Sequence, residues 1–256
     1  MKKLFATERR QLILDILRDK KRVTVKDLAN DVNVSEATLR TDLNILEDEG
    51  LLTRTHGGAI LNEEQLPPKK SFSEREKKNR KSKITIAKKA INLVDHKDCI
   101  LLDASTTTLE LARLLAESNK QITVVTNGLS QAIELKENPV INVILIGGII
   151  RMGSMGIEGL LGSSILNQIN IDKMFTSASG FTIEEGLTDF NVYEVELKRK
   201  MVEKSNKIIA LLDNTKIGTS SIASFATTEE IDTLVVDHEL TPEIRTELDT
   251  RGIKVL

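Results

Sequence analysis

Residues 35–58 carry the side chains best suited to chemistry with DNA. Asn44 can pair with adenine, and Arg40 can pair with guanine or with a phosphate. Ser35 and the free N–H groups of a first helical turn suit a phosphate oxygen. A basic, glycine-tipped hairpin follows, and such a wing touches the DNA backbone beside a helix in the major groove. The predicted DNA-binding residues are Ser35, Thr38, Arg40, Thr41, Asn44, Arg54 and His56.

Two other interpretations of residues 35–58 stay open on pattern alone. A winged helix can bind protein, and a small helical domain can lack a nucleic-acid partner altogether. A metal site is not expected, because no second His or Cys lies near His56.

A second group of polar side chains follows an apolar run at residues 100–102. Asp103 is followed by four consecutive hydroxyl residues, Ser105 to Thr108, which open a helical pattern. Hydroxyls and exposed N–H groups at a helix N-terminus can hold an anion, and ligands of open α/β sheets gather beyond the carboxyl ends of strands. Ordinary helix capping, which needs only one hydroxyl, explains part of this pattern equally well.

Three further apolar runs end in groups that can bind a ligand. Thr126-Asn127 can recognise hydroxyls, and Gly147-Gly148 allows a ligand to approach the backbone. Asp213 and Lys216 place a carboxylate and an ammonium beyond another run. Together these strand ends predict a pocket for a small, anionic, polyhydroxylated molecule, which describes a sugar phosphate.

Three helical patterns with short connections must position the first group. Thr7 and Thr24 are expected to begin the first two helices, and Ser35 to begin a third that Gly50 ends. Leu39, Leu43 and Leu46 share the inner face of the third helix. This spacing is typical of a helix-turn-helix, and the wing would comprise residues 51–58.

The C-terminal part alternates short apolar runs with helical patterns, which predicts a parallel sheet covered on both faces. The fold class is therefore α/β, with an N-terminal winged helix-turn-helix and a C-terminal doubly wound, mostly parallel α/β domain. Expected strands lie at residues 100–102, 122–125, 140–146, 173–177, 208–212, 234–236 and 253–256. Expected helices lie at residues 84–94, 107–118, 129–137, 160–169, 191–206 and 241–250.

Charge and composition divide the chain in the same way. Residues 1–83 carry 19 Lys/Arg against 14 Asp/Glu, whereas residues 84–256 carry 17 against 24. A basic N-terminal part on an acidic remainder suits a DNA-binding domain attached to one that does not bind nucleic acid. The expected domains are residues 1–61 and 84–256, with a linker at 62–83 that contains Pro67-Pro68 and a charge-rich run.

The single cysteine, Cys99, excludes an internal disulfide and a multi-cysteine zinc site. No apolar run is long enough to span a membrane, and no signal peptide precedes the charged residues near the N-terminus. A cytoplasmic protein with no membrane partner, no metal and no cofactor is expected.

The motifs of the N-terminal part resemble the signature of the DeoR family of bacterial transcriptional regulators. The resemblance rests on Ser35-x-x-Thr38-Leu39-Arg40-x-Asp42-Leu43 and on Leu46-Glu47-x-x-Gly50-Leu51-Leu52-x-Arg54-x-His56-Gly57-Gly58-Ala59. Thr41 departs from the second Arg that many members carry, so its base preference is left open.

The resemblance extends over nearly the whole chain. Its further landmarks are Phe72-x-x-Arg75-Glu76, Asp103-x-x-Thr106-Thr107, Thr126-Asn127, Gly147-Gly148, Gly180, Gly186-x-Thr188, Glu196-x-Lys198 and Asp213-x-x-Lys216. The family implies a sugar-phosphate effector in a domain similar to ribose-5-phosphate isomerase. Ser105 replaces the glycine more usual at that place. The candidate effector-binding residues are Asp103, Ser105, Thr106, Thr107, Asn127, Gly180, Lys198 and Lys216.

An active isomerase with an attached DNA-binding domain is the main alternative. Such an enzyme needs a carboxylate base, and Lys198 falls where the resembling isomerase has its catalytic Glu. An ammonium is a poor base unless its pKa is strongly depressed, although Glu194 or Glu196 could take the role. A third possibility is an architectural DNA-binding protein whose C-terminal part only oligomerises.

The sequence favours a regulator, not an enzyme, and a repressor of carbohydrate-metabolism genes more than an activator. Its expected partners are operator DNA and a sugar phosphate. A single small DNA-binding domain buries too little surface for a tight operator complex, so a homodimer or homotetramer is expected.

Overall fold

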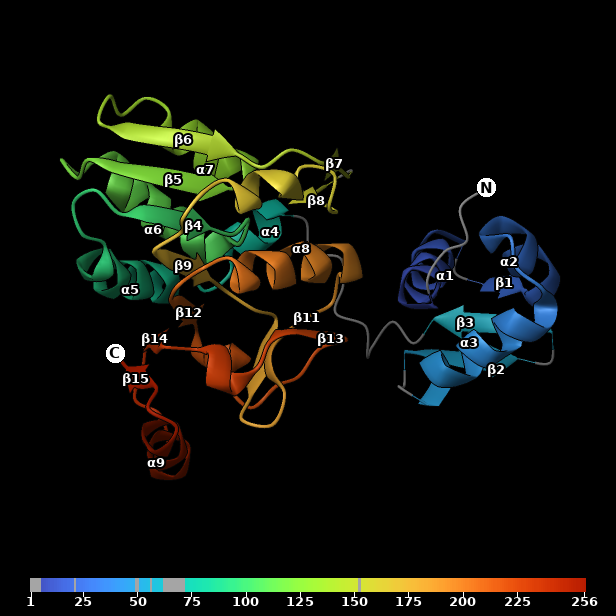
Figure 1. Cartoon of the computed structure of the whole chain (residues 1–256). Coiled ribbons are helices and arrows are strands. Elements are labelled where there is room, and N and C mark those ends of the chain that lie inside the picture. The colour runs from blue at the N-terminus through green and yellow to red at the C-terminus, as the bar shows by residue number, and fades with distance from the viewer. Residues whose placement is uncertain (1–5, 21, 49–50, 56, 62–71, 152) are drawn as a thin grey trace. The chain divides into compact units, whose positions relative to one another are not determined.

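A computed structural model of the whole chain divides into two compact units, Met1–Lys70 and Ser71–Leu256, which we call the head and the body (Figure 1). The structure describes residues 6–20, 22–48, 51–55, 57–61, 72–151 and 153–256. Each unit is described separately below.

The described residues of the head form three helices and a small antiparallel sheet, as the winged helix-turn-helix prediction requires. Thr24 begins the second helix by accepting a hydrogen bond from the Asp27 N–H at 3.2 Å. Asn33 ends that helix in the left-handed conformation, with φ of 56°. The helices are α1 (Ala6–Lys20), α2 (Val25–Val32) and α3 (Glu36–Asp48). The strands, in sheet order, are β1 (Arg22–Thr24), β3 (Gly58–Leu61) and β2 (Leu52–Thr55).

The head core holds α3 in place through both apolar and ionic contacts. Leu39, Leu43 and Leu46 are buried, as their spacing predicts. Asp42, which is also buried, accepts from the Arg9 guanidinium at 2.5 and 3.1 Å and so ties α3 to α1. Gly58 must be glycine, because a Cβ there would lie 2.0 Å from the Val23 carbonyl oxygen.

The body is built on a seven-stranded sheet in which every neighbouring pair is parallel (Figure 1). All seven predicted strands are present, and no end differs from its predicted position by more than one residue. In sheet order they are β15 (Lys254–Val255), β14 (Thr233–Val236), β12 (Ile208–Leu212), β9 (Lys173–Thr176), β4 (Cys99–Leu102), β5 (Ile122–Thr126) and β6 (Ile141–Leu145).

Helices cover both faces of this sheet, which confirms the doubly wound class. One face packs against α5 (Arg80–Ala90), α6 (Thr106–Ala116) and α7 (Leu129–Leu135). The other packs against α8 (Val192–Glu203) and α9 (Pro242–Thr250). Alternate residues of one strand serve the two faces: in β4, Ile100 and Leu102 face the first and Leu101 the second.

The strand order places a topological switch point between β4 and β9. The chain runs from β4 outward through β5 to β6, then returns to β9 on the other side of β4 and continues outward to β15. Open α/β sheets bind ligands beyond the carboxyl ends of strands at such a point. Asp103 and Ser177 follow these two strands directly.

The body contains further elements that sequence patterns did not predict. A second sheet consists of β10 (Gly180–Thr182), β11 (Gly186–Asp189) and β13 (Ala223–Ala226), and β7 (Ile149–Ile150) pairs with β8 (Ile157–Glu158). The shorter helices are α4 (Phe72–Lys77) and the 3₁₀ helices at Ile91–Leu93, Ser163–Asn167, Asn214–Lys216 and Thr228–Glu230.

Two expectations need correction. The helix expected at residues 160–169 is a 3₁₀ helix of five residues, Ser163–Asn167, whose N-cap Gly162 offers no side chain to cap it. The body begins at Ser71, not at residue 84, because α4 and the first turn of α5 lie within the range expected to be linker. No helix in the described part of the chain is long and apolar enough to cross a membrane.

Candidate functional site

The N-terminal turn of α3 is capped as predicted. Ser35 Oγ accepts from the Thr38 N–H at 3.2 Å and lies 2.9 Å from Thr38 Oγ1. Beyond this cap, Ala37, Arg40, Thr41 and Asn44 are exposed, so α3 presents a polar face away from the leucines that pack in the head core. A free polar face on a fixed helix is what a major groove requires.

Among the described residues, the side chains of Arg40 and Thr41 contact only their own helix. The Arg40 guanidinium lies 3.3 Å from Glu36, one turn earlier, and both side chains are more than half exposed. Thr41 Oγ1 donates to the Ala37 carbonyl at 3.2 Å. Exposed i,i+4 pairs contribute only a few tenths of a kcal/mol, so DNA can displace the Arg40–Glu36 pair at small cost.

Arg54 joins the wing to the recognition helix. Its guanidinium donates to the Asn44 side-chain oxygen, and its backbone N–H donates to Glu47 at 2.8 Å. Asn44 and Arg54 therefore form one unit, with the Asn44 oxygen engaged and its NH₂ group available to a base. The predicted contribution of His56 lies outside the described residues.

Asp103 lies at the switch point, and protein groups donate hydrogen bonds to both of its carboxylate oxygens. It is fully buried, and its Oδ2 accepts from Thr176 Oγ1 at 2.7 Å and from the Ser177 N–H at 3.0 Å. Its Oδ1 accepts from the Ser105 N–H and from Thr108 Oγ1, both at 3.0 Å. This carboxylate thereby fastens the end of β4 to the end of β9.

Lys198 on α8 supplies the compensating cation, and it is also buried. Its Nζ lies 2.7 Å from Asp189 Oδ2, 2.8 Å from the Ser177 carbonyl and 3.0 Å from Asp103 Oδ2. The ammonium donates hydrogen bonds to Asp189 and to the Ser177 carbonyl, and Asp103 is its ion-pair partner. Glu194 lies 3.7 Å away as a further carboxylate.

The charged groups around Lys198 shift one another's pKa values. Burial alone would lower the pKa of Lys198, but Asp103, Asp189 and Glu194 raise it well above its ordinary value. Burial likewise opposes ionisation of Asp103, yet Lys198 and the hydrogen bonds it accepts hold its pKa below the usual range. Burial raises the pKa of Glu194 to about 7 against the opposing effect of Lys198. Lys198 thus stays protonated and cannot serve as a base.

In the hydroxyl-rich turn after β4, one hydroxyl caps α6 and the others have different surroundings. Ser105 Oγ caps α6 by accepting from the Thr108 N–H at 3.2 Å. Gln131 Nε2 holds the Ser105 carbonyl at 2.8 Å. Thr107 Oγ1 lies 3.4 Å from Ser177 Oγ, a long contact that a stronger partner can replace. Thr106 precedes it at the first position of α6.

Asn127, Gly180 and Lys216 have different surroundings. Asn127 Nδ2 donates to the Ile157 carbonyl at 2.9 Å, but its buried Oδ1 has no hydrogen-bond partner in the described structure. Gly180 is explained by packing, since a Cβ would lie 2.3 Å from the Thr219 carbonyl oxygen. Lys216 is half-buried, and burial lowers the pKa of its ammonium despite the attraction of Asp213.

The segment before β8 covers the Asn127 end of the site. The Leu129 N–H donates to the Met155 carbonyl at 2.9 Å, and the Ile157 N–H donates to the Asn127 carbonyl at 2.8 Å. Arg151 in the same segment lies 3.0 Å from Glu158 and over the Tyr193 ring of α8 at 4.2 Å. The candidate effector residues are consequently buried, with Lys216 as the partly exposed member.

Sequence patterns missed four residues of this site: Thr176, Ser177, Gln131 and Asp189. Thr176 and Ser177 lie within a run that was assigned to a strand, where their polarity was the available signal. Asp189 lies on β11, in the second sheet, and only the tertiary fold brings it to Lys198.

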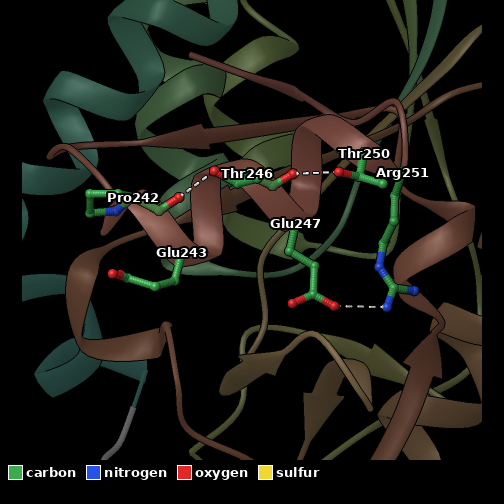
Figure 2. Close-up of a pocket in the computed structure, with 6 residues that line it drawn as sticks. All are labelled: Pro242, Glu243, Thr246, Glu247, Thr250 and Arg251. Carbon is green, nitrogen blue, oxygen red and sulfur yellow. Dashed lines mark hydrogen bonds and ion pairs between the residues drawn. The ribbon is translucent and has the colours of Figure 1, made fainter.

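An open groove along α9 does not coincide with this site (Figure 2). It is lined by Pro242, Glu243, Thr246, Glu247, Thr250 and Arg251, none of which was predicted to bind a ligand. The Glu247–Arg251 pair and the Thr246–Pro242 hydrogen bond are ordinary contacts within an exposed helix. Within the described ranges, no three metal-binding side chains are grouped.

Two family models match the two units of the chain separately. Residues 9–65 match the DeoR-like helix-turn-helix domain, and residues 78–238 match the DeoR C terminal sensor domain. The HTH-type transcriptional regulator GolR of Listeria innocua is 43% identical over 254 residues, covering 98% of each chain. The lactose phosphotransferase system repressor of Lactococcus lactis is 31% identical over 236 residues, covering 92% of each. A ribose 5-phosphate isomerase structure from Methanocaldococcus jannaschii aligns at 17% identity and a TM-score of 0.41, over 54% of this chain and 55% of that one.

Proposed function

This chain belongs to the DeoR family of DNA-binding transcriptional regulators, and we propose that a sugar phosphate bound in its body controls how tightly the head binds operator DNA. The chain is a regulator and not an enzyme. We further propose that it represses carbohydrate-metabolism genes and acts in the cytoplasm, where operator DNA lies.

The observation that carries the effector proposal is a set of polar groups without partners in the described structure, beyond the carboxyl ends of β5 and β12, the strands on either side of the switch-point pair β4 and β9. The Asn127 side-chain oxygen is buried and unsatisfied, which is costly unless a ligand supplies a donor. A sugar hydroxyl is such a donor. The Lys216 ammonium forms no hydrogen bond or ion pair within the described part of the body, so it is free to hold a phosphate.

We propose two roles for the candidate effector residues. Thr106, Thr107, Asn127 and Lys216 retain the capacity to contact a ligand. Asp103 and Lys198 form an ion pair with each other and hydrogen bonds to neighbouring elements. Ser105 caps α6, and Gly180 permits close packing of the second sheet. In this proposal the residues with remaining capacity line the pocket. The other residues, Asp103, Ser105, Gly180 and Lys198, give the pocket its shape.

We also propose that the chain works as a homodimer or homotetramer. A single winged helix-turn-helix buries too little DNA surface for a tight operator complex, and paired heads reading repeated half-sites supply the remainder. Effector binding would then change the spacing or freedom of paired heads through the chain that joins them to the body.

A thermal-shift screen tests the effector proposal directly. Pentose and hexose monophosphates should raise the melting temperature of the full chain, whereas the matching unphosphorylated sugars should not. A hit should then change operator affinity, and operator DNA should change the affinity of the hit by the same factor. If no sugar phosphate stabilises the protein, or if a bound one leaves operator affinity unchanged, the proposal is wrong.

A further inference from the structure

The edge strand β6 leaves backbone groups of the body sheet unpaired. It is the last strand in the sheet order, and β5 is its partner among the described strands (Figure 1). The Ile146 N–H, directly after β6, donates to the Thr126 carbonyl of β5 at 2.8 Å. Because the backbone groups of a strand point alternately to its two sides, those of Ile144 also face β5, and those of Val143 and Leu145 face the open edge. Two residues of β6 therefore offer hydrogen bonds to a further strand.

β6 lacks the features that protect exposed strand edges. Such edges are usually short, or carry charged side chains or prolines that prevent pairing with another chain. The opposite edge of the sheet follows this rule, because β15 has two residues and one of them is the exposed Lys254. β6 has five residues, and the run from Val140 to Ile150 contains neither a charged residue nor a proline. The β6 edge is therefore open to pairing.

Exposed apolar side chains gather at the carboxyl end of β6, where β7 follows (Figure 1). Two segments meet there, since a Cβ on Gly162 would lie 2.2 Å from the Gly147 carbonyl oxygen. Leu145 and β7 flank Gly147, and two leucines precede Gly162. The apolar side chains, with exposed fractions from 42% to 78%, are those of Leu145, Ile149, Ile150, Leu160 and Leu161, and we call them the edge patch.

The edge patch is large for a surface that faces water. Its side chains together expose roughly 500 Å² of apolar surface, whereas each side of a standard protein interface buries about 800 Å². The open backbone edge of β6 extends the same surface. A contiguous apolar patch of this size marks an interaction site, unlike single exposed hydrophobic side chains, which are common on soluble proteins.

A second copy of the same surface is the best match that the described chain offers. An apolar patch needs an apolar partner, and Ile60 is the one large hydrophobic side chain exposed among the described residues of the head. In the described body, Ile133, Val140 and Ile222 are the exposed large hydrophobics outside the edge patch. Residues 84–256 carry 17 Lys/Arg against 24 Asp/Glu, so two bodies repel each other unless they meet at an uncharged surface. The β6 edge and the edge patch are such a surface.

We propose that a second copy of this chain docks on the edge patch and on the open side of β6, so that two bodies form one continuous sheet across a twofold axis. This inference rests on the proposed function, since it names the surface through which two heads become paired. Antiparallel pairing of the two β6 strands satisfies the outward-facing groups of Val143 and Leu145, and the two edge patches cover each other. Main-chain hydrogen bonds and buried apolar area together hold such an interface.

The test compares Leu161→Arg and Ile150→Arg with the wild-type full chain by sedimentation velocity. Both side chains are more than half exposed, so an arginine there should leave the fold of the body intact. Like charges facing each other across the twofold axis should raise the dissociation constant of the assembly at least about tenfold. The wild type should sediment as a dimer or tetramer, and each variant as a species of half that mass. Ile222→Arg places the same charge at an exposed isoleucine outside the edge patch and should keep the wild-type mass.

Hydrogen exchange of the same proteins tests the strand contact. The amides of Val143 and Leu145 should exchange slowly in the wild type and faster in Leu161→Arg, whereas the Ile144 amide, which faces β5, should stay protected in both. Wild-type mass in both edge-patch variants, the result expected if the head of the same chain covers the patch, would overturn this inference. Equally fast exchange of Val143 and Leu145 in wild type and variant would do the same.

Two further measurements separate this inference from the proposed function. A wild-type chain that sediments as a monomer would overturn both this inference and the proposed homo-oligomer. A wild-type oligomer that Leu161→Arg and Ile150→Arg leave intact would overturn this inference alone. Sugar-phosphate binding, measured by thermal shift, should be retained by the variants, because the effector proposal does not depend on this surface. Melting curves without ligand identify any variant that fails to fold.

Discussion

The charged residues of the head and those of the body differ in what surrounds them. On α3, the Arg40–Glu36 pair is more than half exposed on both sides, and Arg54 reaches Asn44 at the surface. In the body, Lys198 and Asp103 are almost fully buried and lie 3.0 Å apart. These two ion pairs, Arg40–Glu36 and Lys198–Asp103, thus lie in opposite environments within one chain.

This difference decides which charges an outside partner can use. Exposed pairs are weakened by water and salt and give way to DNA phosphates at small cost. A buried pair keeps its partners, because removing one leaves an uncompensated charge in a medium of low polarity. The exposed Arg40 of the head is therefore available to an outside partner, whereas the buried Asp42 of the head and the buried Asp103 and Lys198 of the body hold the fold.

The largest expected effect tests the structural role of the buried pair. Lys198→Ala leaves Asp103 and Asp189 without their cation, which should destabilise the body by about 3–5 kcal/mol. Chemical denaturation of the full chain measures this as an earlier transition of the body. Lys200→Ala, which removes an exposed lysine from the same helix, should change stability by less than about 1 kcal/mol. Equal stability of the two variants would remove the distinction between head and body.

The pH dependence of stability sharpens the same comparison. The pKa of Glu194 is about 7 in the folded body against 4.5 when unperturbed, so its neutral form favours folding below pH 4.5. That contribution is lost as pH rises through 7, at up to about 1.4 kcal/mol per pH unit. Glu194→Gln cannot ionise, so its stability relative to wild type should increase between pH 5 and 7. Glu203→Gln, exposed on the same helix, should show no such increase.

A smaller effect is expected at the exposed face of α3. Arg40→Ala should weaken operator binding roughly tenfold and reduce the dependence of affinity on salt concentration by about one charge. Fluorescence anisotropy at several salt concentrations measures both quantities. Sugar-phosphate affinity of the DNA-free protein should stay unchanged, and a loss there would show that the head side chain acts on the body as well.

The smallest effect concerns the partner of Arg40. Glu36→Gln removes a negative charge beside the DNA and releases Arg40 from its exposed pair, so operator affinity should rise about two- to threefold at low salt. The gain should fade as salt screens the charge. If the gain persists at high salt, the Arg40–Glu36 pair is not the weak surface contact that its exposure indicates.

Sequence patterns predicted the seven-stranded sheet well and the buried charged cluster around Lys198 poorly. Short Val/Ile/Leu runs identify strands buried on both faces, and each of the seven runs forms a strand. The capping roles of Thr24 and Ser35 were also readable, because a hydroxyl before a helical pattern acts locally. Burial of Lys198 was not readable, since its partner Asp189 lies on a strand of the second sheet that no pattern revealed.

The start of the body was missed for a related reason. The charge-rich run from Lys69 to Lys83 is typical of a solvated linker, yet Lys83 is buried because it caps the carbonyls at the end of α4. Such a role depends on the neighbouring backbone and leaves no periodic signal. The five-residue 3₁₀ helix at Ser163–Asn167 shows the reverse case, in which a helical pattern lacked the cap that a longer helix needs.

The order in which Asp103 and Lys198 are synthesised determines when this buried ion pair can form. Asp103 is made nearly a hundred residues before Lys198, and the head is made before either. At about 5–20 residues per second, the carboxylate waits roughly 5–20 s for its cation. During that interval the body cannot close its centre, while every described residue of the head has already been made. Each new molecule therefore passes through a stage in which the head has been synthesised completely and the body has not.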